Sequence, residues 1–423
     1  MLRWLVIMVC VVLTSLFIFP VVPAVMPSLN TKMVMAALGL VIFIVKRLLV
    51  GSSKVSKDFA ILSLLAIIVS SVSYFSMVFN GTKDSTFTDY VISVWVWLGG
   101  AYFLVWLYGQ VHENVDVKLI GNYMIAVCVI QCILAYMMTV FPALGSAIDS
   151  LMSEDADRYM GLAEGRMHGL GVALDPAGLK FSAIIIITSF LIANNSFPTT
   201  ASERVLYIIS FIIIAVIGNM ISRSTTVGLL ISVVYLLVYT FTSGDVKASG
   251  KFLIPFSILV VLGVVLATHL YQSNADFMYN LRFGFEGFFS LAEKGHWETH
   301  SNNILLRMIK FPDTFHTWII GDGYFNNPGY DPDFLGEITS GYYKDTDIGY
   351  IRYIFYFGLI GLFALIAVFI KVVMICVSHF KDYKILFILM LVSNLVCWLK
   401  VSSDTFSVFA PFLCLAFMKD DES

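Results

Sequence analysis

Arg223 is one of several residues that could do chemistry, because it stands at a predicted helix start between two hydroxyl-bearing residues. It lies in the sequence SRSTT, whose Ser and Thr side chains can cap the helix that follows. The start of a helix carries free N–H groups and a partial positive charge, so an adjacent guanidinium favours an anion there. Guanidinium groups also bind phosphate oxygens in pairs. We therefore expect Arg223 to bind a phosphate or diphosphate; the competing interpretation is an arginine that extends to the membrane surface.

Arg166 is a second candidate, in the glycine-rich sequence RMHGLGVALDPAG. Glycines let the backbone approach a ligand closely. Asp175 and Pro176 then predict a helix start, with Asp at the cap and Pro at the first helical position. His168 lies within the same segment. Arg166, His168 and Asp175 are therefore candidate substrate-binding residues, and the alternative is a loop that only closes onto a capped helix.

Arg307 is the third candidate arginine, in the sequence NNILLRMIK. Leu305, Leu306 and Ile309 predict a packed apolar face, which would hold Arg307 on a helix rather than on a loose loop. Arg282, in contrast, is expected to contact lipid head groups.

Asp347 is the candidate general base, with Arg352 beside it as a candidate substrate-binding residue. Asp345 and Asp347 precede an apolar run, so one of them is expected to be the N-cap of the helix that begins there. An arginine one turn inside a membrane span is costly and usually faces a partner or a cavity. A carboxylate beside it could accept a proton. Histidines could also do so, and they are His168, His296, His300 and His316.

No motif in the chain predicts a metal ion or an organic cofactor. Walker and Cys/His metal-ligand patterns do not occur in the sequence. The six cysteines all lie in apolar runs, so we expect small buried side chains rather than a disulfide framework. A diphosphate leaving group would then have to be neutralised by arginines.

Composition places these residues in a membrane protein. The chain has 423 residues, of which 59% are hydrophobic and only 13% are charged. A soluble domain carries roughly 25% charged residues, and a chain of this size cannot bury so much apolar surface. The net charge of −3 leaves no basic face for phosphate backbones, which excludes nucleic acid as a partner.

Apolar runs long enough to cross a bilayer predict an all-α polytopic membrane protein with about twelve transmembrane helices. Lys and Arg are concentrated in one set of short connections, which predicts both termini in the cytoplasm. The predicted spans are residues 4–22, 33–50, 59–79, 90–108, 119–141, 177–193, 205–221, 226–242, 252–271, 348–371, 385–400 and 404–418.

The predicted orientation divides the chain into three parts. Residues 1–271 hold nine spans and a smaller periplasmic loop at 142–176. Residues 272–347 form a large periplasmic loop domain, and residues 348–423 hold the last three spans and a cytoplasmic tail. The large loop is rich in aromatic residues, which argues against disorder. Within it, 277–291 predicts an amphipathic helix on the membrane surface and 302–311 predicts a second short helix.

The order of these motifs resembles that of bacterial O-antigen polymerases of the Wzy type and of the related O-antigen ligases. Ala177, Ser224 and Asp347 depart from the family pattern, which has Asn, Gly and, in ligases, His there; Asp347 favours a polymerase. The stretches that carry the resemblance are Arg166 with Gly169, Gly171 and Asp175–Pro176; Ser222–Arg223; Arg307 followed by Ile320–Phe325; and Asp347–Tyr350 with Phe357–Gly361.

The resemblance implies a GT-C-type glycosyltransferase in the bacterial inner membrane. Its donor and acceptor would both be undecaprenyl-diphosphate-linked oligosaccharides of an O-antigen, capsule or exopolysaccharide, joined at the periplasmic face. Membrane lipids surround such an enzyme, and a chain-length regulator protein is a candidate partner. Asp347, Arg223 and Arg307 would be catalytic; Arg166, His168, Asp175, Arg352, His300 and His316 would bind substrate.

Other function classes are separated by where the charges lie. A ligase would instead transfer the glycan to a lipid A core. A flippase or other transporter would need ionisable residues near the middle of the membrane. The predicted spans are nearly free of them, which favours an enzyme. A structural scaffold would not explain arginines at helix starts.

Overall fold

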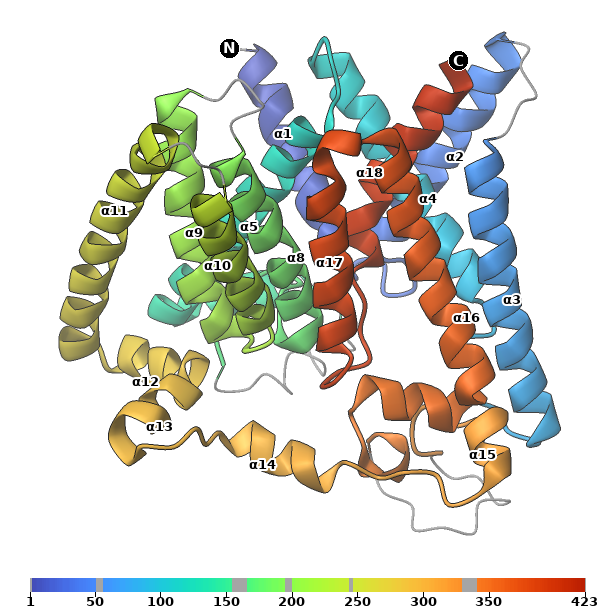
Figure 1. The fold of residues 1–423 in the computed structure, drawn as a ribbon. Coiled ribbons are helices and arrows are strands. Elements are labelled where there is room, and N and C mark those ends of the chain that lie inside the picture. Colours follow the sequence, from blue (N-terminus) through green and yellow to red (C-terminus); the bar gives the residue numbers. More distant parts are fainter. Residues whose placement is uncertain are drawn as a thin grey trace. The chain divides into compact units, whose positions relative to one another are not determined.

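The computed structural model describes residues 2–50, 56–153, 166–194, 200–242, 246–328 and 341–422, and every regular element in these ranges is a helix (Figure 1). Residues 154–165 of the first predicted loop and 329–340 of the second lie outside the described residues. The helices are α1 (Leu2–Ile18), α2 (Thr31–Val50), α3 (Lys57–Phe79), α4 (Tyr90–Val111), α5 (Val117–Val140), α6 (Pro142–Asp149), α8 (Leu174–Ala193), α9 (Ala201–Ile221), α10 (Thr225–Thr242), α11 (Val246–Ser273), α12 (Ala275–Gly284), α13 (Glu286–Lys294), α14 (His300–Arg307), α15 (Phe315–Ile319), α16 (Gly349–His379), α17 (Lys384–Cys397) and α18 (Phe406–Glu422), with 3₁₀ turns at Tyr343–Asp345 and Lys381–Tyr383.

Each of the twelve predicted spans coincides with one of these helices. Among the described residues, seven helices are long and apolar enough to cross a membrane. The prediction of a helical membrane protein is therefore confirmed. The seven helices are α3, α4, α5, α8, α9, α10 and α16.

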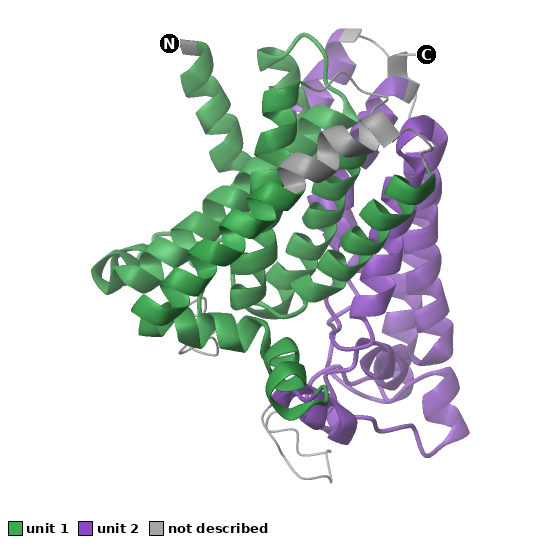
Figure 2. Ribbon diagram, turned by 60° about the vertical axis from the view of Figure 1, so that its left-hand side comes forward, with its two compact units in different colours: residues 1–40, 100–297 green, residues 41–99, 298–423 purple. Residues whose placement is uncertain are grey.

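The chain divides into two compact units, which Figure 2 shows in different colours. The first comprises residues 1–40 and 100–297, and the second comprises residues 41–99 and 298–423. The boundary at 297/298 falls inside the predicted large loop, so α12 and α13 belong to the first unit and α14 and α15 to the second.

Helix α8 forms the core of the first unit. Its most apolar window is 89% buried, because the run from Ala183 to Ile187 offers an apolar face in every direction. It packs on α10 closely: Ser182 Oγ accepts from Gly228 N at 3.0 Å and donates to Ser224 O at 2.8 Å. A Cβ on Gly228 would lie 2.7 Å from the Ser182 carbonyl carbon, so only glycine permits this approach.

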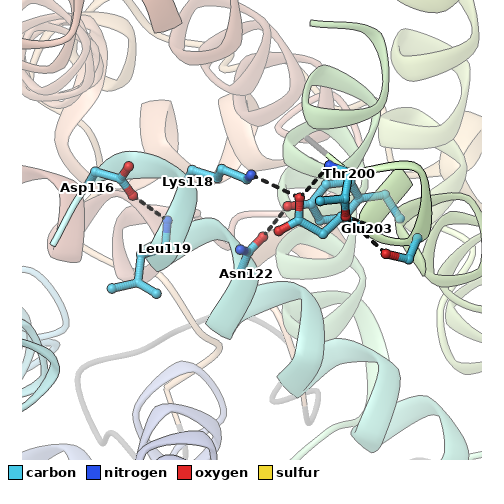
Figure 3. Close-up of polar contacts among 8 residues, drawn as sticks. Asp116, Lys118, Leu119, Asn122, Thr200 and Glu203 are labelled. Atoms are coloured by element: carbon cyan, nitrogen blue, oxygen red, sulfur yellow. Dashed lines mark hydrogen bonds and ion pairs between the residues drawn. The ribbon is translucent and has the colours of Figure 1, made fainter. Parts of the chain in front are cut away.

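The first turns of α5 and α9 lie at the same end of the first unit (Figure 3). Asp116 accepts from Leu119 N at 2.7 Å and caps α5. Lys118 Nζ lies 3.5 Å from Glu203 Oε2, and Glu203 forms a capping box with Thr200 at the start of α9. Helices α5 and α9 therefore run in the same direction, as the predicted orientation requires.

In the second unit, α16 is interrupted at Phe357 and Gly358, where the sequence predicts one continuous span over 348–371. Gly358 has φ 67°, which favours glycine. At the interruption, two carbonyl groups of α16 accept hydrogen bonds from the loop after α15. Asp322 N donates to Phe355 O at 2.6 Å, and Gly323 N donates to Tyr356 O at 3.1 Å. The segment Ile320–Phe325 thus holds this break in place.

The predicted helix caps are wrong at two positions. Helix α8 begins at Leu174 with Ala173 as its N-cap, so Asp175 lies in the first turn. The N-cap of α16 is Ile348, which makes no side-chain cap bond, so neither Asp345 nor Asp347 caps it. Asp175 instead accepts from Ser222 and Ser224, and Asp347 pairs with Arg352 in the first turn of α16, and these contacts compete with capping.

The predicted helices of the large loop are shorter than expected. The amphipathic segment 277–291 is broken at Phe285, which ends α12 and precedes α13. The predicted helix at 302–311 is α14, which ends at Arg307. Leu305 packs on the buried cluster around Tyr343, but Leu306 is 67% exposed. Ile309 is also exposed, at 44%, so the prediction of a packed apolar face around Arg307 is correct for only one of its three residues.

We predict that Gly228→Ala lowers thermal stability, because its Cβ would press against the Ser182 backbone and overpacking costs about 1–3 kcal/mol. Gly263→Ala is the matched control, since its Cβ would meet only Ile212 at an ordinary 3.5 Å. The midpoint of thermal unfolding in detergent should fall for the first variant and stay or rise slightly for the second. Equal midpoints would contradict the close α8–α10 packing.

Candidate functional site

Two arginines of the first unit share one aromatic ring. The Cζ atom of Arg223 lies 4.4 Å from the ring centroid of Phe283, and that of Arg166 lies 5.1 Å from the same centroid. Arg223 comes from the turn between α9 and α10, Arg166 from the segment before α8, and Phe283 from α12. Three stretches far apart in sequence thus bring two guanidinium groups together over one ring.

Asp175 connects the ends of three helices, α8, α9 and α10, near these arginines. Its Oδ1 accepts from Ser222 Oγ at 3.1 Å and also from Ser224 Oγ. The start of α8 is thereby bound to the end of α9 and the start of α10. A Cβ on Gly178 would lie 2.8 Å from Ser222 Cβ, so glycine allows this contact. The expectation that spans six and eight begin at the same end is confirmed within this unit.

Helix α12 is seated on the end of α9, which places Phe283. A Cβ on Gly284 would lie 2.9 Å from the Asn219 carbonyl, so the two backbones touch. Asn219 Oδ1 in turn accepts from Thr226 Oγ1 at 2.6 Å. Phe277, at the other end of α12, packs edge-on against Tyr136. The contacts of Gly284 and Phe277 therefore hold α12 in place, and with it the Phe283 ring that both arginines contact.

Glu286 is the ion-pair partner of Arg223, through Oε2 and Nη1. The two side chains are 33% and 16% exposed, so the pair is partly buried. Burial lowers the pKa of Arg223, Glu286 opposes that shift, and the nearby Arg166 adds to it. Sequence reasoning missed Glu286, because its partner lies 63 residues away and no local pattern marks it.

His168 belongs to the same segment as Arg166. Its Nε2 lies 3.3 Å from Asp149 Oδ2, at the end of α6, and its Nδ1 lies 3.2 Å from the Arg166 carbonyl oxygen. The histidine therefore connects the arginine segment to α6. Of the predicted site residues, Arg166, His168, Asp175 and Arg223 all lie in this one region of the first unit.

Arg352 is the centre of a second group, in the second unit. Its side chain is 4% exposed and lies with Cζ 3.7 Å from the Phe325 ring centroid and 4.1 Å from that of Tyr342. It donates to Phe325 O and Asn326 Oδ1, both at 2.9 Å, and to Ser402 Oγ.

Asp347 is the acidic partner of Arg352, at 3.6 Å between Oδ1 and Nη1, and its side chain is 23% exposed. The Arg352 guanidinium is satisfied largely by protein groups. Arg352 therefore holds the surrounding residues in place beside Asp347.

Two acidic residues that hold this second group were not singled out from the sequence. Asp84 accepts from the backbone N–H groups of Phe325 and Asn326, at 2.8 and 3.2 Å. Asp322 accepts from Thr317 Oγ1 at 2.7 Å and from Tyr343 OH at 3.2 Å. Burial, and then Asp322, raise the pKa of Tyr343, so this phenol remains a donor. The contacts of Asp84 span more than 200 residues, which no local motif predicts.

The second unit also holds three further predicted residues, Arg307, His300 and His316. Arg307 is an exposed residue at the end of α14, and His300 is an exposed residue at its start. His316 stacks on Phe79 with centroids 5.3 Å apart, and its buried Nε2 has no hydrogen-bond partner among the described residues. The predicted residues thus fall into two groups, one in each unit.

Lys180 is an ionisable residue inside the predicted span 177–193, and it was not among the predicted site residues. It lies in α8, and its Nζ is 5.2 Å from the Phe19 ring centroid. In the sequence, the feature that could have identified it is a charged side chain close to the apolar run from Ala183 to Ile187. Ionisable groups at such positions are usually functional.

The described residues contain no group of three or more His, Cys, Asp or Glu side chains placed to hold a metal ion. All six cysteines are buried thiols, as the sequence predicted. Comparison with protein-family models, with curated proteins and with solved structures gives no match for this chain. The site is therefore defined by its geometry alone: two guanidinium groups at a helix junction, which can bind an anion.

We predict that Arg223→Ala weakens the binding of inorganic pyrophosphate to the purified protein at least about tenfold, because charge-assisted hydrogen bonds are lost. Arg223→Lys should recover little, since an ammonium cannot form the paired contacts. Arg282→Ala is the matched control: this exposed arginine pairs with Glu293 at 2.8 Å, and its Cζ atom lies 4.9 Å from the ring centroid of Phe289 rather than at the candidate site. Isothermal titration measures each affinity. Unchanged affinity in the Ala variant would remove Arg223 from the site.

Proposed function

We propose that this chain is a membrane glycosyltransferase that polymerises undecaprenyl-diphosphate-linked oligosaccharide repeat units. The observation that carries the proposal is the pair of guanidinium groups, Arg166 and Arg223, over the Phe283 ring. Helices α8 and α10 begin beside them, and their N-termini add positive potential. Such a site suits a diphosphate whose negative charge grows as a sugar leaves it.

The proposed reaction is a displacement at the anomeric carbon of the donor sugar. A hydroxyl oxygen of the acceptor repeat unit forms the new bond, and the bond to the diphosphate oxygen breaks. Undecaprenyl diphosphate leaves with the electron pair, and the hydroxyl proton passes to a carboxylate. We assign that carboxylate to Asp347, which is outside the helices and partly exposed beside Arg352. The arginines replace a metal ion in this scheme, and no cofactor takes part.

The proposed topology places all twelve apolar helices across the bacterial inner membrane, with both termini in the cytoplasm and 272–347 in the periplasm. The first unit supports alternating directions: α9 begins beside the start of α5 and ends beside the starts of α8 and α10. The arginine pair then lies at the periplasmic end, where a lipid-linked glycan would meet it. A GT-C-type arrangement and a chain-length regulator as partner belong to the same proposal.

Two alternatives rest on particular residues. An O-antigen ligase would use the same diphosphate donor with a lipid A core as acceptor; Asp347 stands where ligases carry His, which favours the polymerase. A lipid-linked oligosaccharide transporter is favoured by Lys180, the ionisable residue within α8. Lys180→Met in a producing strain separates the classes, since a transporter that depends on Lys180 would lose all surface glycan, whereas the proposed polymerase would keep its polymer.

We predict that Asp347→Asn abolishes polymer in the producing strain while lipid-linked single repeats accumulate. The amide removes the basicity on which proton transfer depends, worth roughly 10²–10⁴-fold in rate. Asp345→Asn is the matched control, because Asp345 is two residues away, 61% exposed and paired with Lys310 at 3.4 Å. A gel of surface polysaccharide, with immunoblotting for protein level, measures the result in a deletion strain carrying each variant.

Three results of this gel are decisive. Single repeats in the empty deletion strain support a polymerase. Normal polymer in the empty deletion strain would contradict the proposed function. Normal polymer from Asp347→Asn would contradict only the assignment of the base, and would direct attention to His300 and His316.

A further inference from the structure

The arginine of the proposed diphosphate site already has an anion bound to it, and that anion belongs to the protein. Glu286 pairs with Nη1 of Arg223, and the pair is partly buried. A comparable pair on the same segment, Arg282 with Glu293, is exposed on both sides. The Arg223 pair therefore differs from an ordinary surface ion pair, whose contribution to stability is small.

Glu286 is held in this place by the same elements that place Phe283. Phe283 lies in the last turn of α12, Gly284 presses on the Asn219 backbone, and Glu286 follows directly after the break at Phe285. The ring under the arginines and the carboxylate paired with one of them are thus three residues apart on one anchored segment. Beyond Glu286, Gly287 lies against the Trp297 ring.

The other carboxylate of the region has a different task. Asp175 accepts from Ser222 and Ser224 and holds the helix ends together. Glu286 is the carboxylate that occupies guanidinium hydrogen-bonding positions a phosphate would use. An anion that needs both N–H groups of Nη1, or the side of the guanidinium that Glu286 occupies, must first separate Arg223 from Glu286.

We infer that Glu286 is a tethered competitor of diphosphate for Arg223. The inference rests on the proposed function, because it assigns a regulator to the same anion site. The apparent dissociation constant of every anion is raised by the inverse of the fraction of molecules in which Arg223 is free of Glu286. Abundant weak anions are thereby kept out, while a tightly bound diphosphate still enters. After transfer, Glu286 can return to Arg223 and favour release of the diphosphate product.

The test compares wild type with Glu286→Gln, Glu286→Asp and the control Glu293→Gln, each purified in lipid nanodiscs. Inorganic pyrophosphate and inorganic phosphate are titrated at matched ionic strength. We expect Glu286→Gln to bind both anions more tightly by the same factor, about tenfold if Arg223 is free in roughly one molecule in ten. Glu293→Gln should bind as wild type does. The midpoint of thermal unfolding reports whether each variant is folded.

Glu286→Asp separates direct pairing from a general effect of charge. Asp keeps the negative charge but is one methylene shorter, so it reaches Arg223 poorly and should bind anions as the Gln variant does. If Glu286→Asp instead behaves as wild type, the effect is that of charge alone and the inference is overturned. Unchanged affinities in Glu286→Gln would also overturn it, with the anion site intact. Failure of wild type and all variants to bind pyrophosphate would remove the anion site itself and with it the proposed function.

Discussion

The candidate site of the first unit depends on the carboxylate of Asp175, which accepts hydrogen bonds from two serine hydroxyls. Ser222 and Ser224 flank Arg223, so binding both of them fixes the turn that carries the guanidinium. Asp175 also follows Arg166 by only nine residues, which keeps the second arginine near the same junction. In a low-dielectric setting such a network is strong when every member is satisfied, and costly when one is lost. Glycines at 178 and 228 let the helices come close enough for these bonds to form.

The second unit is organised by a break rather than by a junction. Helix α16 gives up its regular hydrogen bonds at Phe357 and Gly358, and the freed carbonyls accept from the loop that follows α15. Ser76 of α3 donates to the Tyr356 carbonyl as well, at 2.8 Å. This assigns a structural task to Ile320–Phe325, a stretch that also carries part of the family resemblance. Arg352 and Asp347 lie on the N-terminal side of the break, and their ion pair connects the proposed base to the start of α16.

The sequence predicted the helices well because hydrophobic runs of membrane length are a strong and local signal. Each of the twelve expected spans overlaps a helix, and among the described residues seven helices are long and apolar enough to cross a membrane. Arg166, His168, Asp175 and Arg223 do come together. The errors are of one kind. Asp345 or Asp347 was expected to cap α16, yet neither does, and Asp347 pairs with Arg352 because the buried guanidinium competes for the carboxylate. Glu286 and Asp84 were missed because their partners lie 63 and 241 residues away, and nothing local records such pairings.

The central claim is that arginines, without a metal ion, stabilise a diphosphate leaving group while repeat units are joined. It is tested most directly by incubating the purified protein in nanodiscs with lipid-linked repeat units in excess EDTA. A ladder of glycan lengths on a gel, of equal intensity with and without the chelator, is the predicted result. A ladder that appears only after Mg²⁺ or Mn²⁺ is restored, or single repeats that never lengthen under either condition, would contradict the account.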